Sequence, residues 1–258
     1  MSRALDESSG RETVLLSKNG SVAEVVLNRP QVINAYNIQM RDELFQALET
    51  IRDDPEVRVV VLRGAGSRGF CAGADLTEFG TAPSQVVARE VRWERDVWGL
   101  FLTIKKPLIA AVHGHVIGSG VEIACLCDVR IASDDAVFSM PETSLGMLPA
   151  AGGSQTLPRM VGNGPAMDIL LSGRAVQAQE ARRIGLVHAV VSRERLQEEA
   201  RRVARELASR SPLVTSSVKT AIQNGTDVPL AEGLHLEERL AAQIPHRPSP
   251  MDFRPGRC

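Results

Sequence analysis

The stretch LIAAVHGHVIGSGVEIACLCDVRIA, residues 108–132, contains the alternation of patterns that decides the fold. Residues 108–112 are all apolar, as in a strand buried on both faces, and residues 129–132 form a second, mostly apolar run. Between them, the glycines at 118 and 120 open a segment, up to Cys127, that we expect to be helical. A strand, a helix and a further strand in this order predict two parallel strands joined by a crossover.

The same alternation extends over residues 12 to about 190 and favours an α/β architecture. Lys18-Asn19-Gly20 separates two apolar stretches and indicates a hairpin. Asn37 is placed to cap a helix that runs to about Arg52, with apolar residues every three or four positions along one face. The other expected elements are strands at 14–17, 23–27 and 58–62 and a long helix at 84–105.

The composition changes after Arg193, where the sequence becomes rich in Arg, Glu and Ala. Three helical segments without a strand are expected there, at 194–209, 212–223 and 230–242. We therefore predict a core at residues 1–192, a helical oligomerisation region at 193–244 that packs on a neighbouring subunit, and an extended tail at 245–258.

The bulk properties exclude several classes of protein. A net charge of −1 over 258 residues gives no field that would attract nucleic acid or an anionic membrane. No apolar run approaches the ~18 residues of a membrane span, and residues 1–11 lack the apolar segment of a signal peptide. Four cysteines without a zinc-binding pattern fit free thiols in a reducing compartment. We expect a cytoplasmic, bacterial protein without a metal.

Three features of the sequence point to one active site. Glu122 follows the turn at 118–121, and Glu142 follows Pro141 at the end of a short apolar run. Paired carboxylates can move a proton and a water together when their environments hold their pKa values apart. The third feature is the small-residue loop FCAGAD at 70–75, which leaves backbone N–H groups free to bind an oxyanion.

The chain resembles the crotonase superfamily, the enoyl-CoA hydratases and isomerases, in motifs that occur in the family's order. They include LNRP at 27–30, the FCAGAD loop, and the segments that carry the two glutamates, and the resemblance covers residues 12–224. It implies a crotonase-like ββα spiral core with a C-terminal helical region that forms trimers, or hexamers made of two trimers. It also implies a coenzyme A thioester as substrate, with no separate cofactor.

Residue by residue, the resemblance implies that the thioester oxygen lies between the backbone N–H groups of Ala74 and Ser119. Glu122 would activate water and Glu142 would deliver a proton to the α-carbon, because hydratases of the family carry a glutamate at both positions. Further positions implied in substrate binding are Ala72, Gly73, Asp75, Leu76 and Gly118.

The leading expectation is an enoyl-CoA hydratase that makes a 3-hydroxyacyl-CoA. The alternatives are an isomerase that uses Glu142 alone, a hydrolase or lyase of the same thioester, and, in another class, RNA binding through basic residues near 89–106. Glu90 and Glu94 reduce the positive charge of this segment, so a solvated helix face is favoured. No nucleic acid or membrane partner is expected. The sequence does not define the acyl chain.

Several positions depart from the family's pattern or allow two interpretations. Ser119 stands where glycine is common, and Thr77 stands where many hydratases have a lysine near coenzyme A, a contact that Arg29 could replace. Trp93 and Trp98 could line the acyl channel or belong to the core. His113 and His115 are expected to end a strand rather than bind a metal. Pro245 interrupts the helix with which the family commonly continues.

Overall fold

A computed structural model describes residues 12–78, 80–82, 84, 86, 90 and 94–245 of the chain. The chain divides into two compact units, one up to Ser209 and one from Arg210. The first unit contains the two sheets, and the second contains two helices.

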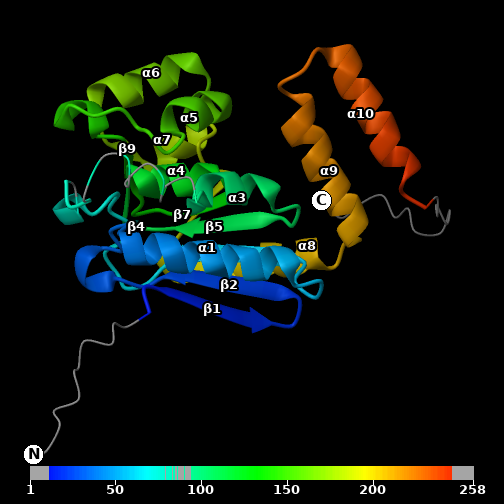
Figure 1. The fold of residues 1–258 in the computed structure, drawn as a ribbon, viewed down its shortest axis with the longest axis horizontal. Coiled ribbons are helices and arrows are strands. Elements are labelled where there is room, and N and C mark those ends of the chain that lie inside the picture. The colour runs from blue at the N-terminus through cyan, green and yellow to red at the C-terminus, as the bar shows by residue number, and fades with distance from the viewer. Residues whose placement is uncertain are drawn as a thin grey trace, which may run out of the picture. The chain divides into compact units, whose positions relative to one another are not determined.

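A six-stranded sheet forms the centre of the first unit, in the order β1-β2-β3-β5-β7-β10. The hairpin of β1 and β2, at the blue end of the chain in Figure 1, is antiparallel, as predicted around Gly20. Every other pair in this sheet is parallel. The strands are β1 Val14–Asn19, β2 Val22–Leu27, β3 Val59–Gly64, β5 Leu108–Val112, β7 Val129–Ser133 and β10 Ala189–Val191.

A smaller sheet has the order β4-β6-β8-β9 and continues from the ends of the strands above. It holds the loops of the expected active site, because β4 precedes the small-residue loop and β6 leads into Gly118. Its strands are β4 Gly69–Cys71, β6 His115–Ile117, β8 Val137–Ser139 and β9 Val176–Gln177. The alternation predicted from the sequence is confirmed as a mixed α/β fold.

The helices of the first unit lie between these strands. They are α1 Ile38–Asp53, α3 Val97–Thr103, α4 Ser119–Cys125, α5 Gly153–Val161, α6 Asn163–Ser172, α7 Ala178–Arg183 and α8 Leu196–Ala208, with 3₁₀ turns η1 Pro30–Val32, η2 Leu76–Glu78, η3 Glu142–Leu145 and η4 Arg193–Arg195. The cap of α1 is confirmed, since Asn37 Oδ1 accepts a hydrogen bond from the Met40 N–H at 3.0 Å. The predicted face of α1 is buried.

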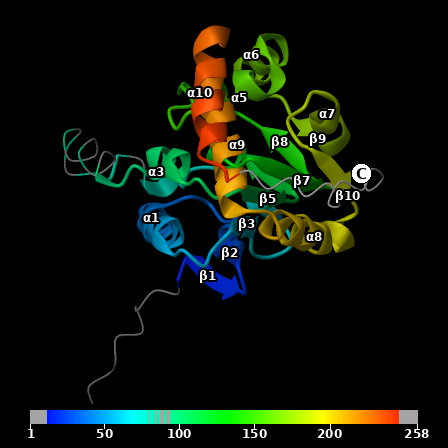
Figure 2. The same cartoon turned by 90° about the vertical axis from the view of Figure 1, so that its right-hand side faces the viewer.

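Both faces of the larger sheet are covered, which explains the continuous apolar runs of β3 and β5. Val60 and Leu62 face the core cluster that includes α1, α3 and α4, whereas Val59 and Val61 face α8. In Figure 2, α1 and α8 lie on opposite sides of β3.

The long helix expected at 84–105 is wrong at its centre. Asp96 has a non-helical backbone, and α3 begins only at Val97. The Asp96 Oδ1 accepts a hydrogen bond from the Gly99 N–H at 2.9 Å, so this residue caps a new helix instead of continuing one. Part of the remaining stretch, including Trp93, lies outside the described residues.

The core also extends further than the boundary expected after residue 192. Helix α8 turns Leu196, Ala200, Ala204 and Ala208 toward the sheet, where they pack on residues such as Val59. The four-residue spacing places these small side chains on one stripe of the helix. The first unit therefore includes α8, because this stripe completes its second core cluster.

The described part of the second unit, up to Pro245, is a pair of helices, α9 Pro212–Gly225 and α10 Leu230–Ala242. Both helices were predicted, and Val218, Ile222, Leu230 and Leu234 are more than half exposed on them. The expected tail lies outside the described residues, apart from Pro245. None of the helices in the described part is both long and apolar enough to cross a membrane.

Candidate active site

Glycine 118 sets the start of α4 and with it the position of Glu122. It has φ 51° and ψ −116°, a conformation that residues with a side chain rarely adopt. A methyl group added here would lie 2.7 Å from the Glu142 Oε1. The carbonyl of Gly118 accepts hydrogen bonds from the N–H groups of Val121 and Glu122, so the helix begins directly after it. Gly118 thus positions one glutamate and contacts the other.

The Glu122 carboxylate is fixed by the backbone of another segment. The side chain is buried, with 2% of the residue exposed. Its Oε1 accepts hydrogen bonds from the Ala151 N–H at 3.1 Å and the Gly153 N–H at 2.9 Å. Gly153 is the first residue of α5, and a methyl group there would lie 3.0 Å from this oxygen. The start of α5 therefore clamps Glu122 from one side.

The Glu142 carboxylate has a different environment. It is half-buried at the start of η3, directly after Pro141. Its Oε2 is buried and has no hydrogen-bond partner among the described residues. Burial raises the pKa of Glu142 above its usual range. This carboxyl group is therefore easier to protonate than an exposed one and has an oxygen available for a ligand.

The small-residue loop presents one backbone donor. The Tyr36 N–H donates to the Gly73 carbonyl, and the Asp75 N–H donates to the Tyr36 carbonyl, both at 2.8 Å. These two bonds flank Ala74, whose own N–H must point away from Tyr36. In the described part of the chain this N–H donates to no other residue.

The second backbone donor is the N–H of Ser119, the first residue of α4. It too donates to no group within the described residues, as expected in a first helical turn. A methyl group on Gly118 would lie 3.7 Å from the Gly73 Cα, so the two loops approach each other closely at these glycines. Ala74 and Ser119 each follow one of the two glycines. The structure thus places two unused N–H groups on neighbouring loops.

The other expected binding residues serve the shape of the loop. The Ala72 N–H donates to the Ile33 carbonyl at 2.9 Å. Asp75 accepts a hydrogen bond from the Thr77 hydroxyl at 2.7 Å and pairs with the Arg29 Nη1 at 2.9 Å, and these contacts lower the pKa of Asp75. Arg29, expected as a replacement contact to coenzyme A, is thus held by Asp75. Leu76 is the exposed member of the set.

The sequence did not reveal the contacts that three residues make around the site. Ala151 and Gly153 hold Glu122 through backbone bonds, for which the run AGG at 151–153 was the only signal. Asn34 is fully buried, and its Nδ2 donates to the carbonyls of Ala65, Gly69 and Phe70. Its side chain therefore ties the chain before α1 to both ends of the turn before β4.

Trp98 packs against the main core cluster, as one of its two expected places, and also lies beside this site. Its ring meets the Tyr36 ring edge-on, with centroids 5.3 Å apart, and its Cδ1 would lie 3.5 Å from a methyl group on Gly152. The Trp98 Nε1 is buried and has no partner among the described residues. Trp98 therefore packs against the segment that clamps Glu122.

The described cysteines and histidines do not form a cluster that could hold a metal. The described residues contain no group of three or more His, Cys, Asp or Glu that could hold a metal. Burial raises the pKa of the Cys71 thiol to about 12 and that of Cys125 to about 11. Cys71 precedes the small-residue loop, and its thiol donates to the Gly73 carbonyl at 4.0 Å.

Known proteins resemble this chain over most of its length. Residues 17–251 match the family model described as enoyl-CoA hydratase/isomerase. The mitochondrial enoyl-CoA hydratase of Pongo abelii is 39% identical and aligns with 86% of this chain and 76% of its own length. The short-chain-enoyl-CoA hydratase of Clostridium acetobutylicum is 38% identical, over 87% of this chain and 86% of its own.

Solved structures agree with this assignment. The crystal structure of an enoyl-CoA hydratase from Bacillus anthracis superposes with a TM-score of 0.84 at 35% identity. The superposition covers 89% of this chain and 90% of that one. This likeness confirms the fold that the resemblance implied.

Proposed function

We propose that this chain, which belongs to the enoyl-CoA hydratase/isomerase family, is an enoyl-CoA hydratase that adds water across the α,β double bond of an acyl-CoA thioester. The single observation that carries the proposal is the pair of glutamates at the start of α4 and η3, held in opposite ways. Glu122 accepts two backbone hydrogen bonds, whereas the Glu142 Oε2 accepts none among the described residues.

In this proposal the thioester oxygen accepts hydrogen bonds from the N–H groups of Ala74 and Ser119. Charge develops on that oxygen as water attacks the β-carbon and an enolate forms. Donors that are already in position stabilise such an oxyanion by ~3 kcal/mol each. The two N–H groups, which lie on neighbouring loops and have no acceptor among the described residues, support this role.

The two carboxyl groups divide the proton transfers. Glu122, fixed by Ala151 and Gly153, accepts a proton from the attacking water, whose oxygen bonds to the β-carbon. Glu142, whose pKa is raised by burial, gives its proton to the α-carbon as the enolate collapses. Water is thus added across the double bond, and the proton held by Glu122 returns to Glu142 through solvent before the next cycle.

The test uses Glu122→Gln and Glu142→Gln with a short enoyl-CoA, following loss of the conjugated-thioester absorbance. Each variant is expected to hydrate at least ~100-fold more slowly, because each lacks one acid or base. The clamp can survive in Glu122→Gln, since the amide oxygen still accepts hydrogen bonds. A Glu122→Gln enzyme with near-full hydratase activity would contradict the two-glutamate mechanism.

An isomerase is the second candidate function, and the environment of Glu142 supports it. An isomerase needs one carboxylate that removes and returns a proton, and the Glu142 Oε2 is free of protein partners among the described residues. The same two variants therefore need a β,γ-enoyl-CoA as a second substrate. Isomerisation that survives Glu122→Gln but not Glu142→Gln, without hydration by the native enzyme, would establish this alternative.

Assembly into trimers, or into hexamers of two trimers, stays a prediction. The exposed apolar side chains of α9 and α10, such as Ile222 and Leu230, support it because large apolar surfaces of this kind mark interfaces. Sedimentation equilibrium is expected to give a trimer or hexamer. A monomer at micromolar concentration would contradict it.

A further inference from the structure

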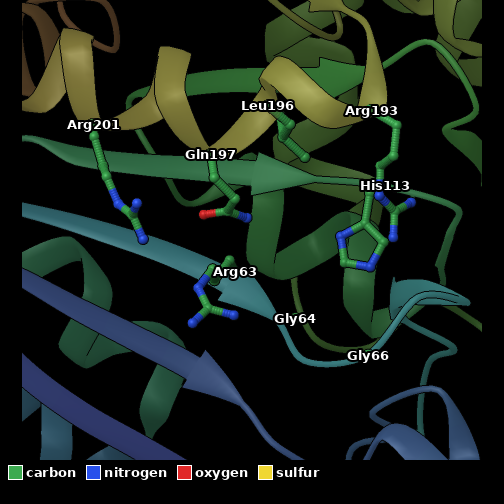
Figure 3. Close-up of a pocket in the computed structure, with 8 residues that line it drawn as sticks. All are labelled: Arg63, Gly64, Gly66, His113, Arg193, Leu196, Gln197 and Arg201. Atoms are coloured by element: carbon green, nitrogen blue, oxygen red, sulfur yellow. The ribbon is translucent and has the colours of Figure 1, made fainter.

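A second polar site lies on the α8 side of the larger sheet, away from the glutamates. It is a hollow of about 320 Å³, near the lower end of the ~300–1,000 Å³ range of small-molecule sites. Its polar lining residues are Arg63, His113, Arg193, Gln197 and Arg201. Figure 3 shows the side chains of Arg201 and Gln197 extending from α8 toward Arg63, with His113 beside Arg193.

The topology explains why these residues meet. Arg63 continues the alternation of Val59 and Val61 on β3, so it lies on the face that α8 covers. His113 follows β5 and occupies the equivalent place after Ile109 and Ala111. The hollow thus lies at the carboxyl ends of two parallel strands, where ligands of α/β sheets bind.

Carboxylates of the protein neutralise the positive charge of the lining only in part. Arg63 pairs through Nε with Glu24 at 2.7 Å, and the same carboxylate lies 3.9 Å from Arg201. Arg193 pairs with Asp135 at 2.8 Å. Three arginines therefore share two carboxylates, and neither carboxylate lines the hollow.

Hydrogen-bond donors are also left over. Arg63 uses only its Nε, so its two terminal nitrogens donate to no other described residue. Arg201 makes the long contact to Glu24 and no hydrogen bond within the described residues. Guanidinium groups present several N–H donors in a planar fork, the arrangement that matches phosphate oxygens.

Two further polar atoms lack partners at the same place. His113 is 3% exposed, and its Nε2 is buried without a hydrogen bond in the described structure. The Gln197 Oε1 is also buried without a hydrogen bond in the described structure. Rotation of that amide by about 180° would present its N–H groups at the same place. Burial and the neighbouring Arg193 lower the pKa of His113 to about 4, so the ring is neutral at pH 7. The other ring nitrogen hydrogen-bonds the backbone of Gly66, so the neutral ring presents Nε2 as an acceptor, which suits a protonated phosphate oxygen.

We propose that this hollow binds a phosphate group, either as inorganic phosphate or as the phosphomonoester of a nucleotide, at a site separate from the glutamates. Arginines from β3, η4 and α8 reach it from different directions, which suits a tetrahedral oxyanion better than a planar carboxylate. A phosphate bound there would contact both the end of β3 and α8. Its binding is independent of the proposed hydratase chemistry.

The test is calorimetric titration of the full chain with inorganic phosphate at constant ionic strength. Native protein is expected to show saturable binding, and Arg201→Met is expected to weaken it about tenfold, as for one charge-assisted hydrogen bond. Arg202→Met is the matched control. Arg202 is the next residue of α8, its side chain is 55% exposed against 56% for Arg201, and it pairs with Glu199 and Glu206. This variant should bind as the native protein does.

Two additional arms identify the ligand and its place. Titration with AMP distinguishes a phosphomonoester from the free ion, and sensitivity of either to Arg201→Met supports the proposal. A repeat with saturating dephospho-coenzyme A, which carries no phosphomonoester, tests whether the ion occupies the proposed thioester site, and phosphate binding should persist. No saturable binding of phosphate or AMP, equal weakening in Arg202→Met, or loss of binding with dephospho-coenzyme A would each overturn the proposal.

Discussion

Glu122 and Glu142 are the same residue type in one site, yet the chain holds them differently. The Glu122 carboxylate receives two N–H groups from the start of α5 and lies in the buried core. The Glu142 carboxylate lies on a short 3₁₀ turn and has a buried oxygen without a hydrogen-bond partner among the described residues. The difference shows that the backbone donors at Glu122 help to distinguish the two carboxylates. One is fixed in place, and the other is poised to exchange a proton.

The comparison extends to one glycine for each glutamate. Gly153 approaches the Glu122 Oε1 and Gly118 approaches the Glu142 Oε1, so each glutamate can be disturbed without being replaced. The predictions that follow use this correspondence, and the first of them concerns the backbone donor at Ser119, directly after Gly118.

The largest effect is expected from Ser119→Pro, which removes the N–H of Ser119 and leaves both carboxylates unchanged. Loss of one oxyanion donor should lower kcat by ~10²–10³. Proline is tolerated in the first turn of a helix, and circular dichroism checks that the variant folds. Ser119→Ala keeps the N–H and should keep most activity. An inactive Ser119→Ala protein that still binds the thioester would show that the hydroxyl matters instead.

A smaller loss of activity is expected from Gly118→Ala, and a still smaller one from Gly153→Ala. The first forces a side chain into a positive φ and within 2.7 Å of the Glu142 Oε1. We expect it to lower kcat by ~10-fold or more, since small displacements of catalytic groups are costly. Gly153→Ala meets the Met140 Cε and the Glu122 Oε1, but the methionine end can move and φ is not positive.

Gly20→Ala is the control for this pair, because Gly20 also has a positive φ, of 58°, but no atom within 4 Å of an added methyl group. It should cost ~1 kcal/mol of stability through backbone strain and leave kcat unchanged. If Gly118→Ala behaved like Gly20→Ala, contact with Glu142 would not be what makes Gly118 necessary.

The smallest effects concern stability, and they should have opposite signs for the two glutamates. Glu122→Ala leaves the Ala151 and Gly153 N–H groups without an acceptor and should destabilise the fold by ~1–3 kcal/mol. Glu142→Gln removes a carboxylate that burial disfavours and should raise Tm slightly at pH 7. Thermal unfolding measures both.

The gain from Glu142→Gln should depend on pH in a defined direction. The folded-state pKa of Glu142 is raised above the ordinary 4.5, so the native state holds this proton more strongly than the unfolded state does. The wild type therefore loses stability as pH rises from 4.5 through the raised pKa. The gain in the variant should be absent below pH 4.5 and complete above that window. A gain independent of pH would assign it to packing.

Local patterns of the sequence were enough for most elements of the fold. Continuous apolar residues marked β3 and β5, and Asn37 marked the start of α1. The long helix at 84–105 was wrong because one side-chain hydrogen bond of Asp96 outweighs a helical pattern. The placement of α8 required knowledge of what its alanines contact, since a helix with a small-residue stripe can pack on a sheet or on another subunit.

The candidate site was predictable in part, through the resemblance that pointed to Glu122 and Glu142. What distinguishes them was not, because Ala151 and Gly153 act through backbone groups that carry no side-chain signature. The arginine-lined hollow was also invisible, since Arg63 and Arg201 are far apart in the sequence and meet only when α8 packs on β3.

The burial of Cys71 gives this site an intrinsic chemical reporter. Thiols react with alkylating reagents as thiolates, and a pKa near 12 together with complete burial keeps Cys71 unreactive while the fold is closed. Because Cys71 directly precedes the loop that carries Ala74, labelling it requires that loop to detach from β6. The rate of alkylation at Cys71 would thus report how often the proposed oxyanion loop opens, without any engineered probe.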